Sequence, residues 1–152
     1  MGFWKCAVLT ALISAVPVVE LRGGLPFGLA GGLTPLQALL ISTLGNLLPV
    51  PVIILLVRRV FLWLKKSAKI GPWIEKLETR AHLKGRIVQK YRLWGLMSLV
   101  AIPLPGTGAW TGALVAAVLD IRLRSAMPAI AAGVVIAGLL ILTISLGVRE
   151  IF

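Results

Sequence analysis

Glu20 and Arg22 are the residues whose types and spacing best suit chemistry inside a lipid bilayer. They directly precede Gly23–Val57, a stretch without a single charged residue. A charge at membrane depth costs about 2.5–3.5 kcal/mol on insertion scales, so such a pair is a candidate for function. A carboxyl group withdrawn from water binds a proton more readily, and a guanidinium can hold a phosphate with two hydrogen bonds. The alternative is that both are loop charges at the membrane surface or simply pair with each other.

A second candidate strip runs from Pro103 to Thr111. Its glycines allow close approach of the backbone, and free N–H groups at the start of a short helix favour an anion. Trp110 is expected to line a cavity or to face lipid. The predicted substrate- or proton-binding residues are Glu20, Arg22, Pro26, Asn46, Pro103, Pro105, Gly106, Thr107, Gly108, Trp110 and Thr111.

Helix packing is the competing explanation for the small and polar residues in both strips. Gly24–Gly28, Gly28–Gly32 and Gly108–Gly112 each have the GxxxG spacing that lets two helices approach closely. Asn46, within an apolar segment, is expected to hydrogen-bond a neighbouring helix or to line the site.

Enzyme motifs are missing from the sequence. One His and one Cys cannot build a nucleophilic triad or a metal cluster, and no HExxH, P-loop or paired-carboxylate pattern occurs. The sequence therefore predicts a protein that is not an enzyme and that uses neither a metal nor a cofactor.

The composition predicts an all-α integral membrane protein. Hydrophobic residues make up 59% of the 152 residues and charged residues only 14%, against roughly a quarter charged in soluble domains. Three long runs carry no charge: 23–57, 93–119 and 125–148. These runs exclude a soluble enzyme, a nucleic-acid-binding domain and a disordered chain.

A basic segment from Arg58 to Arg92 divides the chain. It holds eleven of the sixteen Lys and Arg residues, against Glu75 and Glu78. Positive charge beside apolar spans favours the cytoplasmic side, and helical spacing after Gly71-Pro72 predicts a basic amphipathic helix on anionic lipids. Nucleic acid is not an expected partner. The predicted lipid-surface residues are Arg58, Arg59, Lys65, Lys66, Trp73, Lys76, Arg80 and Lys84.

Two apolar segments, Gln37–Val57 and Ser125–Val148, are long enough to cross a bilayer. The first follows Thr34-Pro35-Leu36-Gln37, which predicts a capping box with a proline at the first helical position. Pro49 and Pro51 are expected to kink this span, and Pro128 falls in the predicted first turn of the second span.

The other two apolar segments are interrupted. Phe3–Val19 is followed by a break at 20–26 and a short stretch to Gly32, and Trp94–Ile102 by a break at 103–108 and a short helix, Ala109–Leu119. Each pattern predicts a re-entrant helical hairpin, whose broken backbone protein or a water-filled cavity must cover.

The order of hairpin and span is the same in both halves, and an offset of 88 residues aligns Gly24 with Gly112 and Gly45 with Gly133. We therefore predict two inverted repeats, 1–57 and 93–152, joined by the cytoplasmic linker 58–92. Arg122 and Arg124 would then also be cytoplasmic. The rival arrangement has four full spans with both termini inside.

Three stretches resemble the small multidrug export protein family: Glu20-Leu-Arg-Gly-Gly-Leu-Pro-Phe-Gly28, Leu44-Gly-Asn-Leu-Leu-Pro-Val-Pro51 and Ile102-Pro-Leu-Pro-Gly-Thr-Gly-Ala-Trp-Thr-Gly112. That family is similar to the DedA and VTT membrane proteins. The resemblance implies paired re-entrant hairpins, movement of lipids such as polyprenyl phosphates, and a hairpin carboxylate, here Glu20. The family's arginines near the proline motif are missing around Ile102, so Arg22, Arg122 or Arg124 would have to supply that charge.

These observations predict a secondary transporter or lipid translocase for an amphipathic, anionic substrate, proton-coupled through Glu20. The alternatives are an exporter of cationic lipophilic drugs and, in another class, a membrane scaffold that does not transport. Expected partners are membrane lipids, an amphipathic small molecule or lipid phosphate, and a second copy in a homodimer that packs through the glycine-rich faces. The expected location is a bacterial or archaeal plasma membrane.

Overall fold

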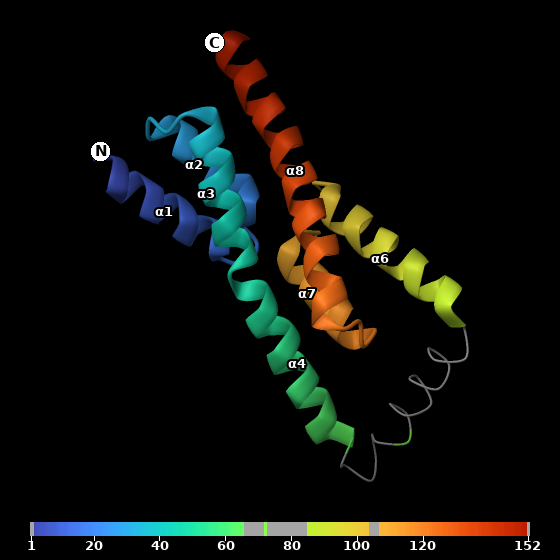
Figure 1. Ribbon diagram of the computed structural model, residues 1–152. Coiled ribbons are helices and arrows are strands. Elements are labelled where there is room, and N and C mark those ends of the chain that lie inside the picture. The colour runs from blue at the N-terminus through green and yellow to red at the C-terminus, as the bar shows by residue number, and fades with distance from the viewer. Residues whose placement is uncertain (1, 66–71, 73–84, 104–106, 152) are drawn as a thin grey trace.

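The computed structural model describes residues 2–65, 72, 85–103 and 107–151, and the elements within these ranges are helices. The all-α prediction is therefore confirmed for this part of the chain (Figure 1). The helices are α1 (Phe3–Ala15), α2 (Glu20–Ala30), α3 (Pro35–Leu47), α4 (Pro49–Lys65), α6 (Gly85–Ala101), α7 (Ala109–Val118) and α8 (Leu123–Ile151).

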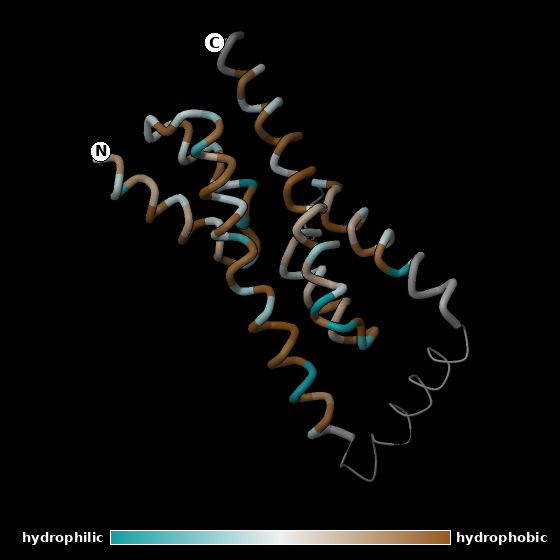
Figure 2. Tube along the Cα trace, in the orientation of Figure 1, coloured by the Kyte–Doolittle hydropathy of each residue, from teal (hydrophilic) through white to brown (hydrophobic). Residues whose placement is uncertain are grey.

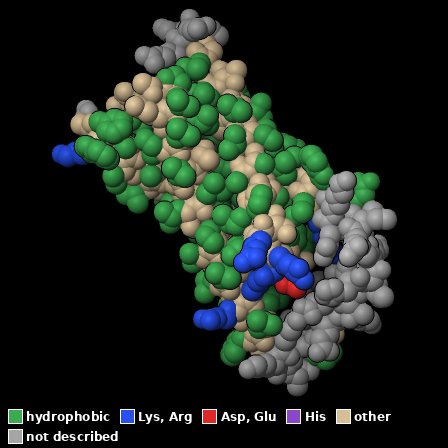
Figure 3. Space-filling model, viewed as in Figure 1, with side chains coloured by type: hydrophobic (Ala, Val, Ile, Leu, Met, Phe, Trp, Pro, Cys, Tyr) green, Lys and Arg blue, Asp and Glu red, His purple; other side chains and the backbone are tan. Residues whose placement is uncertain are grey.

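Two helical stretches are long and apolar enough to cross a membrane. They are Pro35–Trp63, formed by α3 and α4, and Leu123–Val148 in α8. Hydrophobic side chains such as Leu44, Leu56 and Leu140 are exposed along them. Figure 2 shows the hydrophobic residues that recur along the chain, and Figure 3 shows the apolar surface on one face of the molecule. Such a surface suits contact with lipid and is unusual for a soluble monomer.

The two spans begin and bend close to the predicted places. Thr34 and Gln37 form the predicted capping box, with hydrogen bonds in both directions. α3 ends at Leu47 and α4 begins at Pro49, so the span is interrupted directly before the first of the two prolines predicted to kink it. α8 begins at Leu123 rather than at the predicted Ser125, which puts Pro128 inside the helix and beyond its first turn.

The first break lies earlier than predicted. α1 ends at Ala15 because Pro17 lacks an N–H group and forces Val16 into an extended conformation, with φ −73° and ψ 132°. The expected break at 20–26 is wrong, since Glu20 is already the first residue of α2. Pro26 lies within α2 and leaves the carbonyl of Arg22 without its usual helical donor.

The helix before the second break is longer than the predicted nine residues from Trp94. α6 begins at Gly85 and crosses the predicted repeat boundary between Arg92 and Leu93, because its polar first half contains good helix formers and no proline. The rest of the predicted linker helix lies outside the described residues, including Lys66, Trp73, Lys76, Arg80 and Lys84.

Each half contains a helical hairpin packed on a long helix. α1 and α2 pack on each other and on α3, and α6 and α7 pack on α8. Arg92, in the middle of α6, donates a hydrogen bond to Leu119 O directly after α7. The chain between them therefore turns back, and the end of α7 lies beside the middle of α6.

The two halves also interlock. α4 packs against α7, and α8 packs against α2, so each long helix touches the short helix of the other half. One apolar cluster joins the halves, and its fully buried side chains include Leu25, Ile54, Leu96 and Ile130. In Figure 1, the path from α3 through α4 and the path of α8 run in opposite directions.

Equivalent helix ends recur at nearly constant offsets. α1 and α6 end 86 positions apart, at Ala15 and Ala101. The short helices end in the same cap 88 positions apart, because Leu33 N donates to Gly28 O as Ile121 N does to Ala116 O.

Two pairs of glycines mark the same close contacts in each half. A Cβ at Gly24 would overlap Ser14, and one at Gly112 would overlap Val100. A Cβ at Gly45 would overlap Ala11 O, and one at Gly133 would lie 2.7 Å from Met97 O. The glycines differ by 88 positions and their partners by 86, so the same close contacts recur in both hairpins.

Candidate functional site between the two broken hairpins

Glu20 connects the two hairpins. It is only 7% exposed, and it is the first residue of α2, with a left-handed φ of +49°. Its Oε1 accepts a hydrogen bond from the backbone N–H of Trp110 at 3.3 Å. This N–H belongs to the first turn of α7, whose positive end favours a carboxylate. Glu20 of the first hairpin therefore caps the short helix of the second.

Gly108, directly before α7, makes room for this carboxylate. A Cβ at Gly108 would overlap Glu20 Oε2, and the φ of +156° is one that residues with side chains rarely adopt. Glu20 and Gly108 are 88 positions apart, so they occupy equivalent places at the starts of the two short helices. The N-terminal ends of α2 and α7 thus meet at this point.

A reciprocal pair of hydrogen bonds ties each break to the other half. Arg22 Nη2 donates to the backbone O of Thr107 and, at 3.0 Å, to its Oγ1. Trp110 Nε1 donates to the carbonyl of Ala15, the last residue of α1, at 3.1 Å. Arg22 and Trp110 are also 88 positions apart. Equivalent positions of α2 and α7 therefore reach across to the opposite break, by a guanidinium in one case and an indole in the other.

A small pocket lies beside this junction, with room for about one water molecule. It is lined by Glu20, Leu21, Arg22, Asn46, Val100, Gly108, Ala109, Val134, Ala137 and Ile141. Asn46 lies near the middle of the span Pro35–Trp63, and Ala137 lies near the middle of the span Leu123–Val148. The pocket is therefore placed at half the length of both long helices.

Asn46 brings an unused acceptor to the pocket. The residue is 3% exposed, and its buried Oδ1 has no hydrogen-bond partner. The expected bond from a neighbouring helix is thus not made to this oxygen. Leaving a buried acceptor unpaired costs about 1–3 kcal/mol, which a donor from water or from a ligand in the pocket would offset.

The remaining predicted site residues that the structure describes are not in the pocket lining. Pro26 is half-buried in α2, Pro103 and Thr107 are half-buried between α6 and α7, and Thr111 lies in the first turn of α7. Thr107 reaches the site through Arg22, and its hydroxyl donates to Ile102 O at 2.7 Å. Pro105 and Gly106 are outside the described residues.

Two arginines from other helices, Arg58 of α4 and Arg92 of α6, contact the opposite end of α7. The sequence analysis did not predict these contacts. Arg58 Nη2 lies 2.9 Å from Asp120 Oδ1 and donates to Ile121 O at 2.7 Å. Arg92 adds its bond to Leu119 O, and cations suit the negative end of a helix. Of the lipid-surface set, Arg59 lies on α4 beside Arg58, and the side chain of Lys65 is not described. The sequence feature that could have indicated this contact is Asp120, an acidic residue that directly follows a short apolar helix and has basic residues near it.

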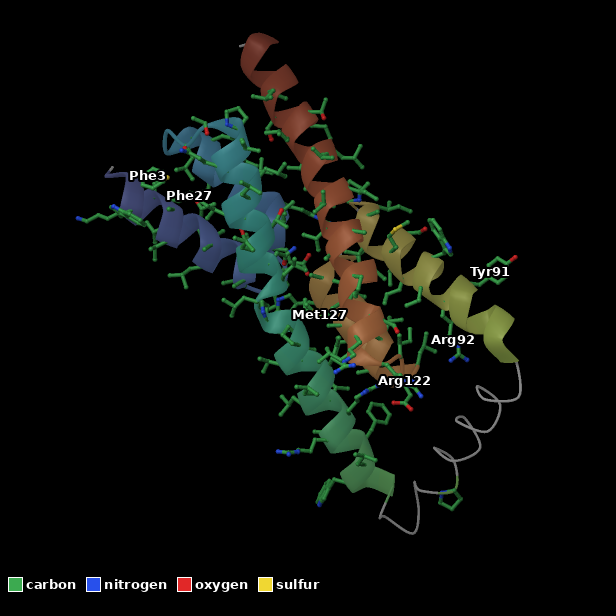
Figure 4. All side chains as sticks on the ribbon, in the orientation of Figure 1. Phe3, Phe27, Tyr91, Arg92, Arg122 and Met127 are labelled. Carbon is green, nitrogen blue, oxygen red and sulfur yellow. The ribbon has the colours of Figure 1, made fainter. Side chains whose placement is uncertain are left out.

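Among the three arginines proposed to supply positive charge, Arg22 lines the pocket. Arg122 is exposed at the end where α7 meets α8, near Arg92 (Figure 4). Arg124 is exposed at the start of α8. Figure 3 shows Lys and Arg side chains gathered at that end beside an acidic group.

Comparison with known proteins identifies a family. The model of the family described as "Putative small multi-drug export protein" matches residues 20–140, a range that includes the second break and the pocket lining except Ile141. This chain belongs to that family. No curated protein and no solved structure matches it. Membership in the small multi-drug export family, together with the two long apolar helices, indicates a membrane protein with a role in export.

Proposed function

We propose that this member of the small multi-drug export family is a secondary transporter that binds the charged head of an amphipathic substrate beside Glu20. The observation that carries the proposal is a buried carboxylate on the N-terminal end of α7, at half the length of both spans. A buried ionisable group among membrane helices is costly to keep. Such groups mark substrate and proton paths in transporters.

The proposed architecture is a pair of inverted repeats, each with a re-entrant hairpin and one span. The offsets of 86 and 88 positions, the opposite directions of the long helices and the pocket between the breaks support it. α1 has 13 residues and would extend about 20 Å, less than the roughly 30 Å of the hydrocarbon core. In transporters of this plan, one repeat rocks against the other around a site near the midplane.

The proposed substrate is an amphipathic anion such as a lipid phosphate. The donors at the junction are the N–H of Trp110 at the N-terminal end of α7, which bonds to the Glu20 carboxylate, and the guanidinium of Arg22, which lines the same pocket. A cationic lipophilic drug, with Glu20 as the counter-charge, is the second candidate, and the family's description favours it. The relationship to DedA and VTT proteins stays a prediction.

The cellular setting is also part of the proposal. We place the protein in a bacterial or archaeal plasma membrane with the basic segment 58–92 in the cytoplasm. We also propose a homodimer, but the glycine-rich faces no longer support it. Gly24, Gly28 and Gly112 pack within the chain, against Ser14, Thr10 and Val100 respectively.

Flux through proteoliposomes tests the function. Wild-type protein is expected to move a fluorescent lipid phosphate across the bilayer, and Glu20→Gln is expected to lose most of that flux while keeping its melting temperature. Asp120→Asn is the matched control, because this acid is 57% exposed and lies at the far end of α7. Equal flux in wild type and Glu20→Gln would contradict the proposal, and no flux of either an anion or a cation through wild type would favour the scaffold.

A further inference from the structure

We infer that the carboxylate of Glu20 is an internal substitute for the anionic group of the substrate, and that the substrate anion binds at α7 together with a proton on Glu20. This inference rests on the proposed function, and it fixes both the substrate class and the sign of the coupling. The class is an amphipathic molecule with a phosphate, sulfonate or carboxylate head.

The first step is that the best anion position in the pocket is already filled. Glu20 Oε1 accepts the bond from Trp110 N, and Oε2 lies against Gly108, where the missing side chain admits it. The N–H groups that begin a helix are also the groups that an incoming phosphate or sulfonate needs. Substrate anion and ionised Glu20 therefore compete for the same donors.

The second step is electrostatic. Two negative charges held a few ångströms apart in a buried site repel strongly, so one of them must leave or be neutralised. Glu20 belongs to the chain and cannot diffuse away. Taking a proton from water removes its charge and frees the end of α7 for the anion.

The third step is that the pocket keeps hydrogen-bonding capacity for a ligand. Asn46 lines the same pocket and is only 3% exposed. Its buried Oδ1 has no hydrogen-bond partner. A protonated head group, a bridging water or protonated Glu20 can donate to it. Arg22 lines the pocket with a guanidinium that has five N–H donors, and its Nη2 already donates to Thr107.

The fourth step is that a single carboxyl group sets the coupling. The charged group facing Glu20 in the described pocket lining is the guanidinium of Arg22. The lining residues of the other helices do not titrate: Asn46 of α3, Val100 of α6, Gly108 and Ala109 at α7, and Val134, Ala137 and Ile141 of α8. One proton is therefore expected to bind with each substrate anion.

This arrangement gives opposite signs for the two substrate classes. An anion that binds with a proton gains affinity as the pH falls, by up to about tenfold per pH unit. A cation that needs the ionised carboxylate gains affinity as the pH rises. Anion and proton would therefore move in the same direction, whereas a cationic drug would exchange with a proton.

Calorimetric titration of the full-length protein in detergent tests the inference. The probes are farnesyl sulfonate and tetraphenylphosphonium, whose charges do not change with pH, with farnesol as the uncharged match for the sulfonate. Wild type is expected to bind the sulfonate more tightly at mildly acidic than at mildly basic pH. Glu20→Gln should bind it tightly at both, because its neutral side chain imitates the protonated acid, and Asp120→Asn should keep the wild-type dependence.

Two results would overturn the inference: sulfonate affinity in wild type that is flat or rises with pH, or tetraphenylphosphonium as the only ligand whose binding depends on Glu20. If Glu20→Gln does not fold, Arg22→Gln tests the inference instead. This variant should bind the sulfonate more weakly than wild type and keep the same change of affinity with pH. The transport proposal fails separately. Glu20-dependent flux without pH-linked anion binding refutes only the inference, and pH-linked binding without flux refutes only the transporter.

Discussion

Glu20 and Gly108 lie against each other although 88 positions separate them. Glu20 carries a carboxylate, and Gly108 has no side chain. The first residue therefore fills the space that the second leaves open. The pair Arg22 and Trp110 differs in the same way, because each reaches the other half's break with a different donor. The site is thus built from residues 88 positions apart that carry different side chains.

Gly108→Ala is expected to destabilise the protein by more than about 1 kcal/mol, because the new Cβ needs the space of Glu20 Oε2 and the φ of +156° is strained for alanine. Gly95→Ala is the matched control. It lies within α6 with open space around it, and it should stabilise by about 0.5–1 kcal/mol. Melting temperatures in detergent measure both, and shifts of the same sign would contradict the proposed contact.

α7 has a negative charge at its N-terminal end and positive charges at its C-terminal end. The carboxylate of Glu20 lies at its N-terminal end, and Arg58 and Arg92 donate to carbonyls at its C-terminal end. Both arrangements complement the helix dipole. Because α7 packs on α4, α6 and α8, these contacts fix a ten-residue helix that is too short to be stable alone.

The repeated close contacts give a prediction for the elements. Gly45→Ala and Gly133→Ala are both expected to lower the melting temperature, since each new Cβ meets the backbone of the hairpin's first helix. Gly147→Ala, in α8 with nothing near it, should not. Should Gly45→Ala and Gly133→Ala differ widely, with one of them harmless, the two halves would not share one packing plan.

At the scale of the whole molecule, the basic residues gather where the spans and the second hairpin meet. There, Arg58 pairs with Asp120 and donates to Ile121 O. Arg92 donates to Leu119 O, one residue before Asp120. The C-terminus lies at the other end of α8 (Figure 1). The hairpin model therefore puts Arg124 in the cytoplasm and Gly147 outside, whereas four full spans would do the reverse.

Cysteine labelling in intact cells distinguishes the two topologies. With Cys6 replaced by Ala, a membrane-impermeant maleimide should label Thr34→Cys and Gly147→Cys but not Arg124→Cys. All three positions are exposed in the structure. Labelling of Arg124→Cys together with protection of Gly147→Cys would support the four-span arrangement.

Much of this architecture could be predicted because local chemistry determines it. The charge-free runs predicted apolar helices, Thr34 and Gln37 predicted a cap, and Pro49 predicted a bend. The prediction misplaced the first break because a charged residue followed by glycines is typical of a loop. Pro17 alone stops α1, and tertiary contacts allow Gly23 and Gly24 within α2.

The sequence by itself determined the membrane character, the order of hairpin and span, and the residues with chemical potential, because hydropathy, proline and buried charge act locally. Only the tertiary structure decided that Glu20 fills the end of α7, that Arg22 binds Thr107 and that Asn46 shares their pocket. Such contacts join residues as many as 90 positions apart. They depend on how the two halves pack, and hydrophobic periodicity carries no information about that.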